Sequence, residues 1–168
     1  MIKLVILDVD GVLTDGRKTY GTDGVCISKT FCDKDFTAIK KLKSSGVNIC
    51  FCSGDANINE AIAKNRNIDF YNARHKEKCS FTNEFEKKYN CTLDEMLFIG
   101  DDIFDIGLLK KVGFSVCPSD AANEVKKVCD LILQSKGGDH ALCELVNFLY
   151  KNNFIENYNY ENLKVTDA

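Results

Sequence analysis

Residues 4–11 read LVILDVDG, an apolar run that ends in two aspartates, Asp8 and Asp10. Four consecutive apolar residues fit a β-strand that is covered on both faces, as in a parallel sheet. Two carboxylates at positions i and i+2, just past the end of such a strand, can point into one cavity. Asp and Gly are also common turn residues, so this stretch alone is equally compatible with a simple turn.

Four later apolar runs repeat this pattern, at residues 47–52, 96–99, 114–116 and 131–133. Between the runs, apolar residues recur at helical spacing, and we expect helices around residues 36–42, 58–62, 81–89, 108–112 and 142–149. This alternation predicts an α/β fold, a Rossmann-like parallel sheet with helices on both faces. The active site of such a sheet lies at the carboxyl ends of its strands.

Residues 17–31 interrupt the alternation. Their apolar side chains surround two glycines, which predicts a β-hairpin flap inserted after the first strand. No comparably long insertion occurs elsewhere, so we expect one domain over residues 1–151, without a separate cap domain. Residues 152–168 are rich in Asn, Tyr and Glu and have no clear period, and we expect a C-terminal tail there.

The composition argues against a nucleic-acid-binding protein, a disulfide-bonded protein and a membrane protein. The net charge is −3 and the basic residues are scattered, whereas nucleic-acid binding needs a concentrated basic face. The nine cysteines include no CxxC pair, so we expect free thiols that pack as small apolar groups in a reducing compartment. No apolar run approaches the roughly 20 residues of a membrane span, and the N-terminus lacks a signal-peptide pattern. We therefore expect a cytoplasmic protein that binds neither nucleic acid nor membrane.

A second acidic cluster follows the 96–99 run and consists of Asp101, Asp102 and Asp105. Parallel strands would bring this cluster to the same sheet edge as the first pair of aspartates. So many carboxylates would repel one another without a cation, and a hard ion with oxygen ligands, such as Mg²⁺, resolves the conflict. A helix N-terminus would explain Asp102 alone, but not two acidic clusters at two strand ends.

Two further features point to phosphate binding. Ser53 and Gly54 follow the second apolar run, where a hydroxyl and a glycine amide at a helix start can bind an anion. Ser is also a good helix N-cap, so this feature is weak by itself. A lysine that neutralises phosphoryl charge is expected before the third helix, and Lys76 and Lys78 are both candidates.

Taken in order, these motifs resemble those of the haloacid-dehalogenase superfamily of phosphotransferases, from Leu4 to about Leu149. A narrower resemblance is to the small uncapped phosphatases of 3-deoxy-2-ulosonate phosphates. It rests on the segment GVLTDG at residues 11–16, Lys29, Phe31, Lys34-Asp35 and Gly137-Gly138. The resemblance implies an uncapped phosphoric monoester hydrolase that requires Mg²⁺.

The resemblance also implies roles for three acidic residues. Asp8 would attack phosphorus and form an aspartyl phosphate. Asp10 would protonate the leaving sugar oxygen and later take a proton from the attacking water. Asp8, Asp101 and the backbone carbonyl of Asp10 would hold the Mg²⁺ ion.

The remaining motif residues would position the phosphoryl group. Ser53, the Gly54 amide and Lys78, which matches the motif lysine better than its neighbour does, would bind the transferring oxygens. Asp102 and Asp105 would orient metal-bound water or the lysine.

The substrate is left open between two sugar acids, 3-deoxy-manno-octulosonate 8-phosphate and a nonulosonate 9-phosphate. Asp55 follows the Ser53-Gly54 pair and should face the substrate, paired with Arg66, unless it simply caps the helix. Because an aspartate there would repel a substrate carboxylate, we favour the nonulosonate ester.

Two alternatives remain. One is a phosphatase of other small phosphates, and the other is a non-catalytic oligomerisation module related to the C-terminal domain of acylneuraminate cytidylyltransferases. The resemblance to the uncapped group implies a homotetramer, in which the hairpin of residues 17–31 packs against neighbouring subunits and shields the site.

Overall fold

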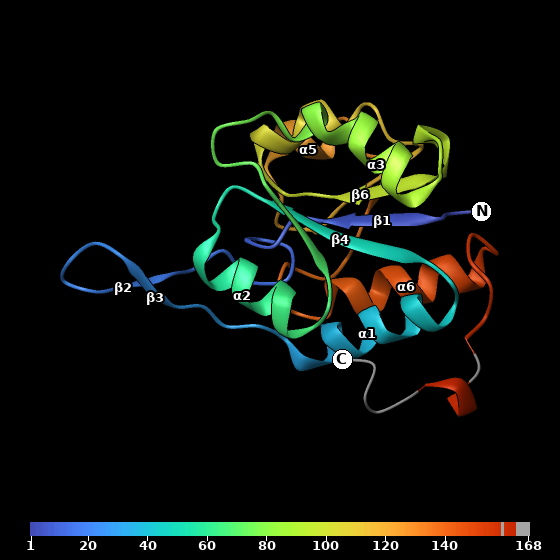
Figure 1. Ribbon diagram of the computed structural model, residues 1–168, viewed down its shortest axis with the longest axis horizontal. Helices are drawn as coiled ribbons and strands as arrows, with labels where there is room; N and C mark the ends of the chain where they lie inside the picture. The colour runs from blue at the N-terminus through green and yellow to red at the C-terminus, as the bar shows by residue number, and fades with distance from the viewer. Residues whose placement is uncertain (159, 164–168) are drawn as a thin grey trace.

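Six parallel strands in the order β5-β4-β1-β6-β7-β8 form the centre of the computed structural model, which describes residues 1–158 and 160–163 (Figure 1). The elements in chain order are β1 (Leu4–Leu7), β2 (Thr19–Tyr20), β3 (Cys26–Ser28), α1 (Asp33–Ser44), β4 (Asn48–Ser53), α2 (Asn57–Asn65), β5 (Asp69–Asn72), η1 (Lys78–Phe81), α3 (Thr82–Tyr89), η2 (Leu93–Glu95), β6 (Met96–Ile99), η3 (Ile103–Asp105), α4 (Ile106–Leu109), β7 (Phe114–Cys117), α5 (Asn123–Lys126), β8 (Leu131–Ile132), α6 (Ala141–Lys151) and η4 (Tyr160–Asn162). The predicted parallel α/β sheet is confirmed.

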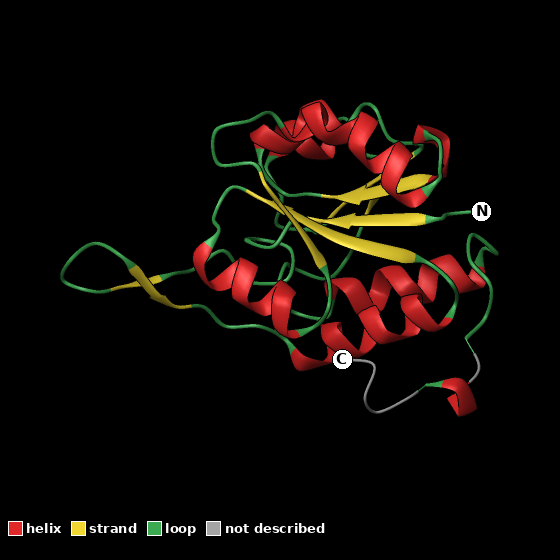
Figure 2. Ribbon diagram, viewed as in Figure 1, coloured by secondary structure: helices red, strands yellow, loops and turns green. Residues whose placement is uncertain are grey.

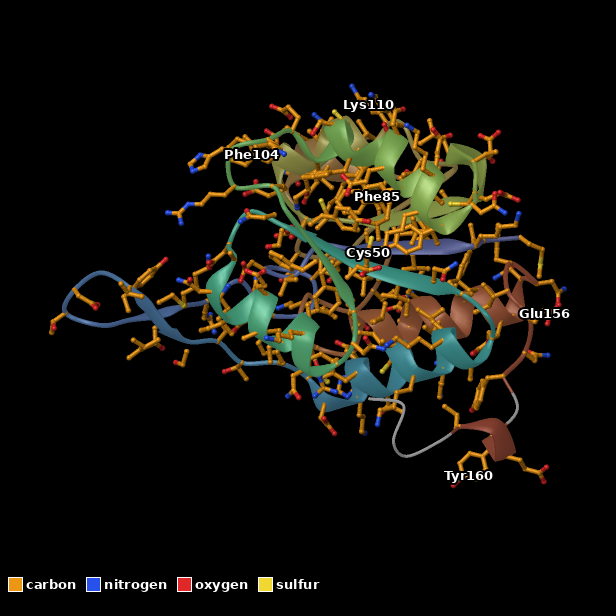
Figure 3. The ribbon with its side chains drawn as sticks, in the orientation of Figure 1. Cys50, Phe85, Phe104, Lys110, Glu156 and Tyr160 are labelled. Atoms are coloured by element: carbon orange, nitrogen blue, oxygen red, sulfur yellow. The ribbon has the colours of Figure 1, made fainter. Side chains whose placement is uncertain are left out.

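Helices cover both faces of the sheet, as Figure 2 shows, which explains why the strand sequences are continuously apolar. Val5 and Leu7 of β1 pack in the cluster that includes α1 and α6, whereas Leu4 and Ile6 pack in the cluster that includes α3. Figure 3 shows Phe85 of α3 in this second layer. Alternate side chains of one strand therefore serve two separate hydrophobic cores.

The strand β5 was not predicted from the sequence. Its residues, DFYN, carry a polar residue at each end, and within the described chain β5 pairs only with β4 at the edge of the sheet. An edge strand is only partly covered, so it does not need the continuous apolar run that marks the central strands. The short helix α5 was missed because a single turn is too brief to show a period.

The predicted hairpin is confirmed as β2 and β3, which form their own two-stranded sheet and project away from the body of the molecule (Figure 1). An isolated bridge between Thr14 and Phe31 closes its base. Tyr20, Val25 and Ile27 are exposed on the projecting part.

The predicted tail begins inside the folded core rather than outside it. Phe154 stacks on Phe114 with ring centroids 5.0 Å apart, and Ile155 is buried. The backbone carbonyl of Phe154 accepts a hydrogen bond of 2.9 Å from the amide of Ile2. The first residues of the expected tail thus pack against the core through an aromatic ring, which a search for helical periodicity does not detect. Residues 159 and 164–168 of that expected tail lie outside the described residues.

All nine cysteines are free, as expected, and Cys50, Cys52, Cys91 and Cys117 are buried among apolar side chains. In the part of the chain that the structure describes, none of the helices has both the length and the apolar character needed to cross a membrane.

Candidate active site

A cavity of about 740 Å³ opens where the carboxyl ends of β1, β4 and β6 meet. Its walls contain nearly all the residues that the sequence motifs indicate, namely Asp8, Asp10, Ser53, Gly54, Asp55, Lys78, Asp101, Asp102 and Asp105. The parallel topology brings these residues together from segments almost a hundred positions apart, as expected for the carboxyl edge of such a sheet.

Lys78 is buried between two carboxylates. Its ammonium nitrogen lies 2.9 Å from Oδ2 of Asp8 and donates a hydrogen bond to Oδ1 of Asp105. Lys76, the other candidate from the sequence, instead holds its ammonium group 5.5 Å from the ring centre of Phe81. Of the two lysines, Lys78 is the one that the structure brings to Asp8.

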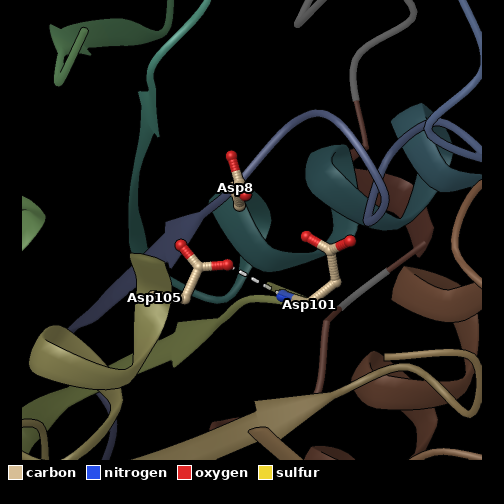
Figure 4. Close-up of side chains that lie close together, drawn as sticks. All are labelled: Asp8, Asp101 and Asp105. Carbon is tan, nitrogen blue, oxygen red and sulfur yellow. Dashed lines mark hydrogen bonds between the residues drawn. The ribbon is translucent and has the colours of Figure 1, made fainter. Parts of the chain in front are cut away.

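Asp101 offers a ligand atom for a cation. Its Oδ1 is buried and has no hydrogen-bond partner among the described residues. Asp8, Asp101 and Asp105 each contribute a carboxylate oxygen within 4.8 Å of the others, and Figure 4 shows the three side chains converging. Such a cluster of hard oxygen ligands fits Mg²⁺.

Asp105 is already engaged by protein donors. One of its oxygens accepts from Lys78, and the other accepts backbone hydrogen bonds of 2.9 and 3.1 Å from the amides of Asp101 and Asp102. Asp102 uses its own side chain to accept a hydrogen bond from the amide of Ile103 at the start of η3. Asp8 and Asp101 are thus the two carboxylates best placed to bind a cation, while Asp105 fixes the lysine.

Two glycines let the loops around these carboxylates approach each other. Gly11 has a φ of +85°, and a side chain there would place its Cβ 1.9 Å from Oδ2 of Asp101. A Cβ on Gly137 would lie 1.8 Å from the backbone oxygen of Gly11. The pair Gly137-Gly138 therefore packs against the loop that follows β1 and holds the backbone beside Asp10 in place.

Asp10 belongs to a polar network that reaches into the hairpin. Its Oδ1 lies 2.8 Å from the ammonium nitrogen of Lys29, and its Oδ2 accepts hydrogen bonds of 3.0 Å from both Lys29 and the Asn59 amide. Asn59 also donates to Oγ of Ser53 at 3.0 Å and accepts from Lys29 at 2.9 Å. Asp10, the acid–base candidate, and Ser53, the candidate for phosphate binding, are therefore joined through one buried amide.

Asp55 is paired with lysines from the two ends of the hairpin. Its Oδ2 lies 2.9 Å from Lys18 and 2.8 Å from Lys29. The expected pair with Arg66 is not formed, because the Arg66 guanidinium stacks 3.5 Å from the ring centre of Phe36 and lies outside the cavity lining. The alternative, that Asp55 caps α2, is also wrong, since the helix is capped at Ala56 without a side-chain hydrogen bond.

The pKa values of Asp8, Asp101 and Lys78 are shifted by burial and by the negative charges that lie close together in the site. Burial raises the pKa of Asp8 despite the opposing charge of Lys78, and Asp105 and Asp101 add to the rise. Burial, with the charges of Asp105 and Asp102, raises the pKa of Asp101 to about 7. Burial alone would lower the pKa of Lys78, but Asp8 and Asp105 raise it, so this lysine stays charged. A cation beside Asp8 and Asp101 would relieve their repulsion.

Three residues of this network were not assigned to the site from the sequence. Lys18 and Lys29 flank the hairpin, and their spacing carries no signal that both ammonium groups turn back to the same aspartate. Asn59 lies on the buried face of α2, where only its polar character at a position expected to be covered hints at a role.

Comparison with known proteins gives a match to the haloacid dehalogenase-like hydrolase family over residues 56–144. The chain is 32% identical over 149 residues to the 3-deoxy-D-manno-octulosonate 8-phosphate phosphatase KdsC of Haemophilus influenzae, covering 88% of this chain and 82% of the relative. It is 29% identical over 150 residues to the protein of the same name from Escherichia coli K12, covering 88% and 79% of the two chains.

Solved structures show the same architecture. The 3-deoxy-D-manno-octulosonate 8-phosphate phosphatase of Moraxella catarrhalis, in complex with a magnesium ion, a phosphate ion and a KDO molecule, superimposes with a TM-score of 0.82 at 29% identity, covering 91% of this chain and 89% of that chain. The cobalt-bound deoxy-D-mannose-octulosonate 8-phosphate phosphatase of Haemophilus influenzae gives a TM-score of 0.83 at 32% identity, covering 89% and 88%.

Proposed function

The chain belongs to the haloacid dehalogenase-like hydrolases, and from this premise we propose that it is a phosphatase that hydrolyses the phosphate monoester of a sugar acid with the help of Mg²⁺. The observation that carries the proposal is the convergence of Asp8, Asp101 and Lys78 at the sheet edge, where two carboxylates and one buried ammonium group can receive a metal and a phosphoryl group. The non-catalytic alternative has no support in a site with these groups in place.

Asp8 and Asp101, with the backbone carbonyl of Asp10, would hold Mg²⁺, which would neutralise charge on the phosphoryl oxygens. A carboxylate oxygen of Asp8 forms a bond to phosphorus while the bond from phosphorus to the sugar oxygen breaks. Asp10, in its protonated form, gives its proton to that oxygen. Water then attacks phosphorus and passes a proton back to Asp10, and the bond between phosphorus and Asp8 breaks.

The phosphoryl oxygens need donors while these bonds change. Lys78 supplies a positive charge that Asp105 holds in position, and Ser53 offers a hydroxyl beside the Gly54 amide. Asn59 orients the Ser53 hydroxyl by donating to its oxygen, which leaves the hydroxyl proton free to point toward the cavity. This serine is thereby set up as a donor to a phosphoryl oxygen.

The choice between the two sugar acids changes once the structure is considered. Our preference for a nonulosonate ester depends on repulsion between Asp55 and a substrate carboxylate, and the positive charges of Lys18 and Lys29 beside Asp55 offset that repulsion. The relatives named above act, by name, on 3-deoxy-D-manno-octulosonate 8-phosphate. We therefore propose the class of 3-deoxy-2-ulosonate phosphate esters, with both chain lengths as candidates.

The test is turnover of a panel of phosphate esters with Mg²⁺ and with excess chelator. The panel contains octulosonate 8-phosphate, a nonulosonate 9-phosphate, a neutral hexose 6-phosphate and p-nitrophenyl phosphate. We expect the highest kcat/KM for one of the two sugar acids, and loss of activity with chelator. Equal or higher kcat/KM for the neutral ester would contradict the proposed substrate class, and full activity in chelator would contradict the metal requirement.

A further inference from the structure

The loop between β5 and η1 forms one wall of the active-site cavity with a run of basic side chains, Arg74, His75 and Lys76. All three are exposed to solvent. None takes part in the steps described above, so the positive charges of Arg74 and Lys76 in the cavity wall need another explanation.

The backbone of this loop is held firmly beside the phosphate-binding residues. The amide of Ala73 donates to the carbonyl oxygen of Ser53 at 2.9 Å, and the amide of Arg74 donates to Oδ1 of Asn72 at 3.0 Å. A Cβ built on Gly54 would lie 4.0 Å from the Cα of Arg74. Arg74 therefore projects from a fixed backbone position, and its side chain forms part of the cavity wall while it remains exposed to solvent.

Two other cations in the cavity wall, Lys18 and Lys78, are already neutralised by protein carboxylates. Lys78 is paired with Asp8 and Asp105, and Lys18 is paired with Asp55. Among residues 1–158 and 160–163, by contrast, Arg74 forms no ion pair with a carboxylate. Of the strong cations in the wall, Arg74 is thus one whose charge remains available to a ligand.

We infer that Arg74 binds the carboxylate of the sugar-acid substrate, with Lys76 adding positive charge, an inference that rests on the proposed function. In such an ester the phosphate and the carboxylate sit at opposite ends of the carbon chain. With the phosphate beside Asp8, the carboxylate is left to the mouth of the cavity, where the loop lies. A guanidinium group can bind a carboxylate through two parallel hydrogen bonds, which gives geometric selectivity as well as attraction.

The test is steady-state kinetics of Arg74→Ala, Arg74→Lys and Lys76→Ala with octulosonate 8-phosphate, a neutral hexose 6-phosphate and p-nitrophenyl phosphate. Lys110→Ala is the control, because Lys110 is an exposed lysine outside the cavity lining (Figure 3). For Arg74→Ala we expect KM for the sugar acid to rise about tenfold with kcat nearly unchanged, as for the loss of a charge-assisted contact. KM for the two esters without a carboxylate should stay within about twofold, and Arg74→Lys should recover part of the loss.

Two outcomes would overturn the inference while leaving the proposed function intact. The first is an equal rise in KM for all three esters, which would assign Arg74 to the phosphate instead. The second is an unchanged KM for the sugar acid in both Arg74 variants. A wild-type enzyme that hydrolyses the neutral esters but no sugar-acid ester would overturn the proposed function itself, and the inference with it.

Discussion

The ammonium nitrogen of Lys29 lies 2.8 Å from Oδ1 of Asp10, and the lysine side chain has no exposed surface. Lys29 follows the second strand of the hairpin, whereas Asp10 follows the first strand of the sheet. The same ammonium group is 2.8 Å from Asp55. One buried cation thus joins the hairpin, the proposed acid–base residue and the loop after β4.

Replacing Lys29 should harm both stability and catalysis. In Lys29→Met, Asp10 and Asp55 lose a buried counter-ion, and we expect the free energy of unfolding in urea to fall by about 3 kcal/mol. We also expect kcat to fall by at least about tenfold, because Asp10 loses the group that positions it. Lys18→Met, which removes a partly exposed lysine from the same network, should have a smaller effect on both quantities. Equal losses of unfolding free energy and of kcat in the two variants would contradict the conclusion that Lys29 is the main counter-ion of Asp10 and Asp55.

Asp8→Asn should abolish turnover without unfolding the protein, because an amide cannot form the acyl phosphate. Burial of an uncharged amide costs less than burial of a crowded carboxylate, so the thermal midpoint of this variant should equal or exceed that of the wild type. Asp33→Asn is the control, because Asp33 is exposed and lies outside the cavity lining, and its activity and thermal midpoint should stay close to those of the wild type. Phosphatase activity of Asp8→Asn within tenfold of the wild type would remove Asp8 from its proposed role.

The stability of the metal-free protein should fall as the pH rises from about 4 to 7. The folded pKa of Asp101 is about 7, above its usual value of 3.8, so in this window the folded state holds a proton that the unfolded state has released. Mg²⁺ should reverse the trend by neutralising the carboxylates, and the gain in thermal midpoint on adding it should be larger at pH 8 than at pH 5.

The variant Asp101→Asn separates this effect from other titrations. It should weaken the pH dependence between pH 4 and 7, with the remainder due to the raised pKa of Asp8, and it should lose the thermal shift on adding Mg²⁺. A wild-type protein whose midpoint does not respond to Mg²⁺ at either pH would contradict the assignment of the metal to this site.

The hairpin should mediate assembly. Tyr20, Val25 and Ile27 expose 59%, 47% and 62% of their surface on a two-stranded ribbon, more apolar area than such a ribbon leaves in water. We predict a homotetramer that covers these side chains, to be measured by light scattering at micromolar concentration. Ile27→Asp should dissociate the tetramer. A wild-type protein that is monomeric under these conditions would contradict the prediction that the hairpin mediates assembly.

Gly137→Ala should displace the loop that carries Asp10, although Gly137 itself has no proposed catalytic role. The added Cβ would lie 1.8 Å from the backbone oxygen of Gly11, so the loop after β1 must move, at a cost of several kcal/mol in unfolding free energy. Gly46→Ala is the matched control, because Gly46 has a φ of +76° but open space around it, and only the roughly 1 kcal/mol cost of that conformation is expected. Similar losses in the two variants would exclude the proposed contact.

The sequence predicts those parts of the fold in which local pattern and tertiary environment agree. The run Leu4–Leu7 is a strand because both faces of β1 are covered, and the family resemblance drawn from the motifs that follow such runs is confirmed by the comparisons. The edge strand β5 escaped prediction because partial burial allows polar residues. The first residues after α6 were taken for a tail because aromatic stacking on Phe114 has no period in the sequence.

The site shows the same division. Strand topology alone brings Asp8 near Asp101, so their proximity follows from the motifs. The ion-pair partners of Asp55 depend instead on how the hairpin lies against the loop after β4. The spacing of residues along the chain does not predict that arrangement. Arg66 lies eleven positions after Asp55 in the sequence, yet it stacks on Phe36, while lysines 37 and 26 positions away make the pairs.

The pairing of both hairpin ends with Asp55 has a consequence for chimeric proteins. A ribbon exchanged between two relatives carries Lys18 at one junction and Lys29 at the other, and each lysine needs its acceptor in the recipient. A junction placed between them separates charges that fold as one unit. The smallest segment that can be transplanted with its buried charge still paired therefore runs from Lys18 through Lys29, and the recipient must carry aspartates at positions 10 and 55.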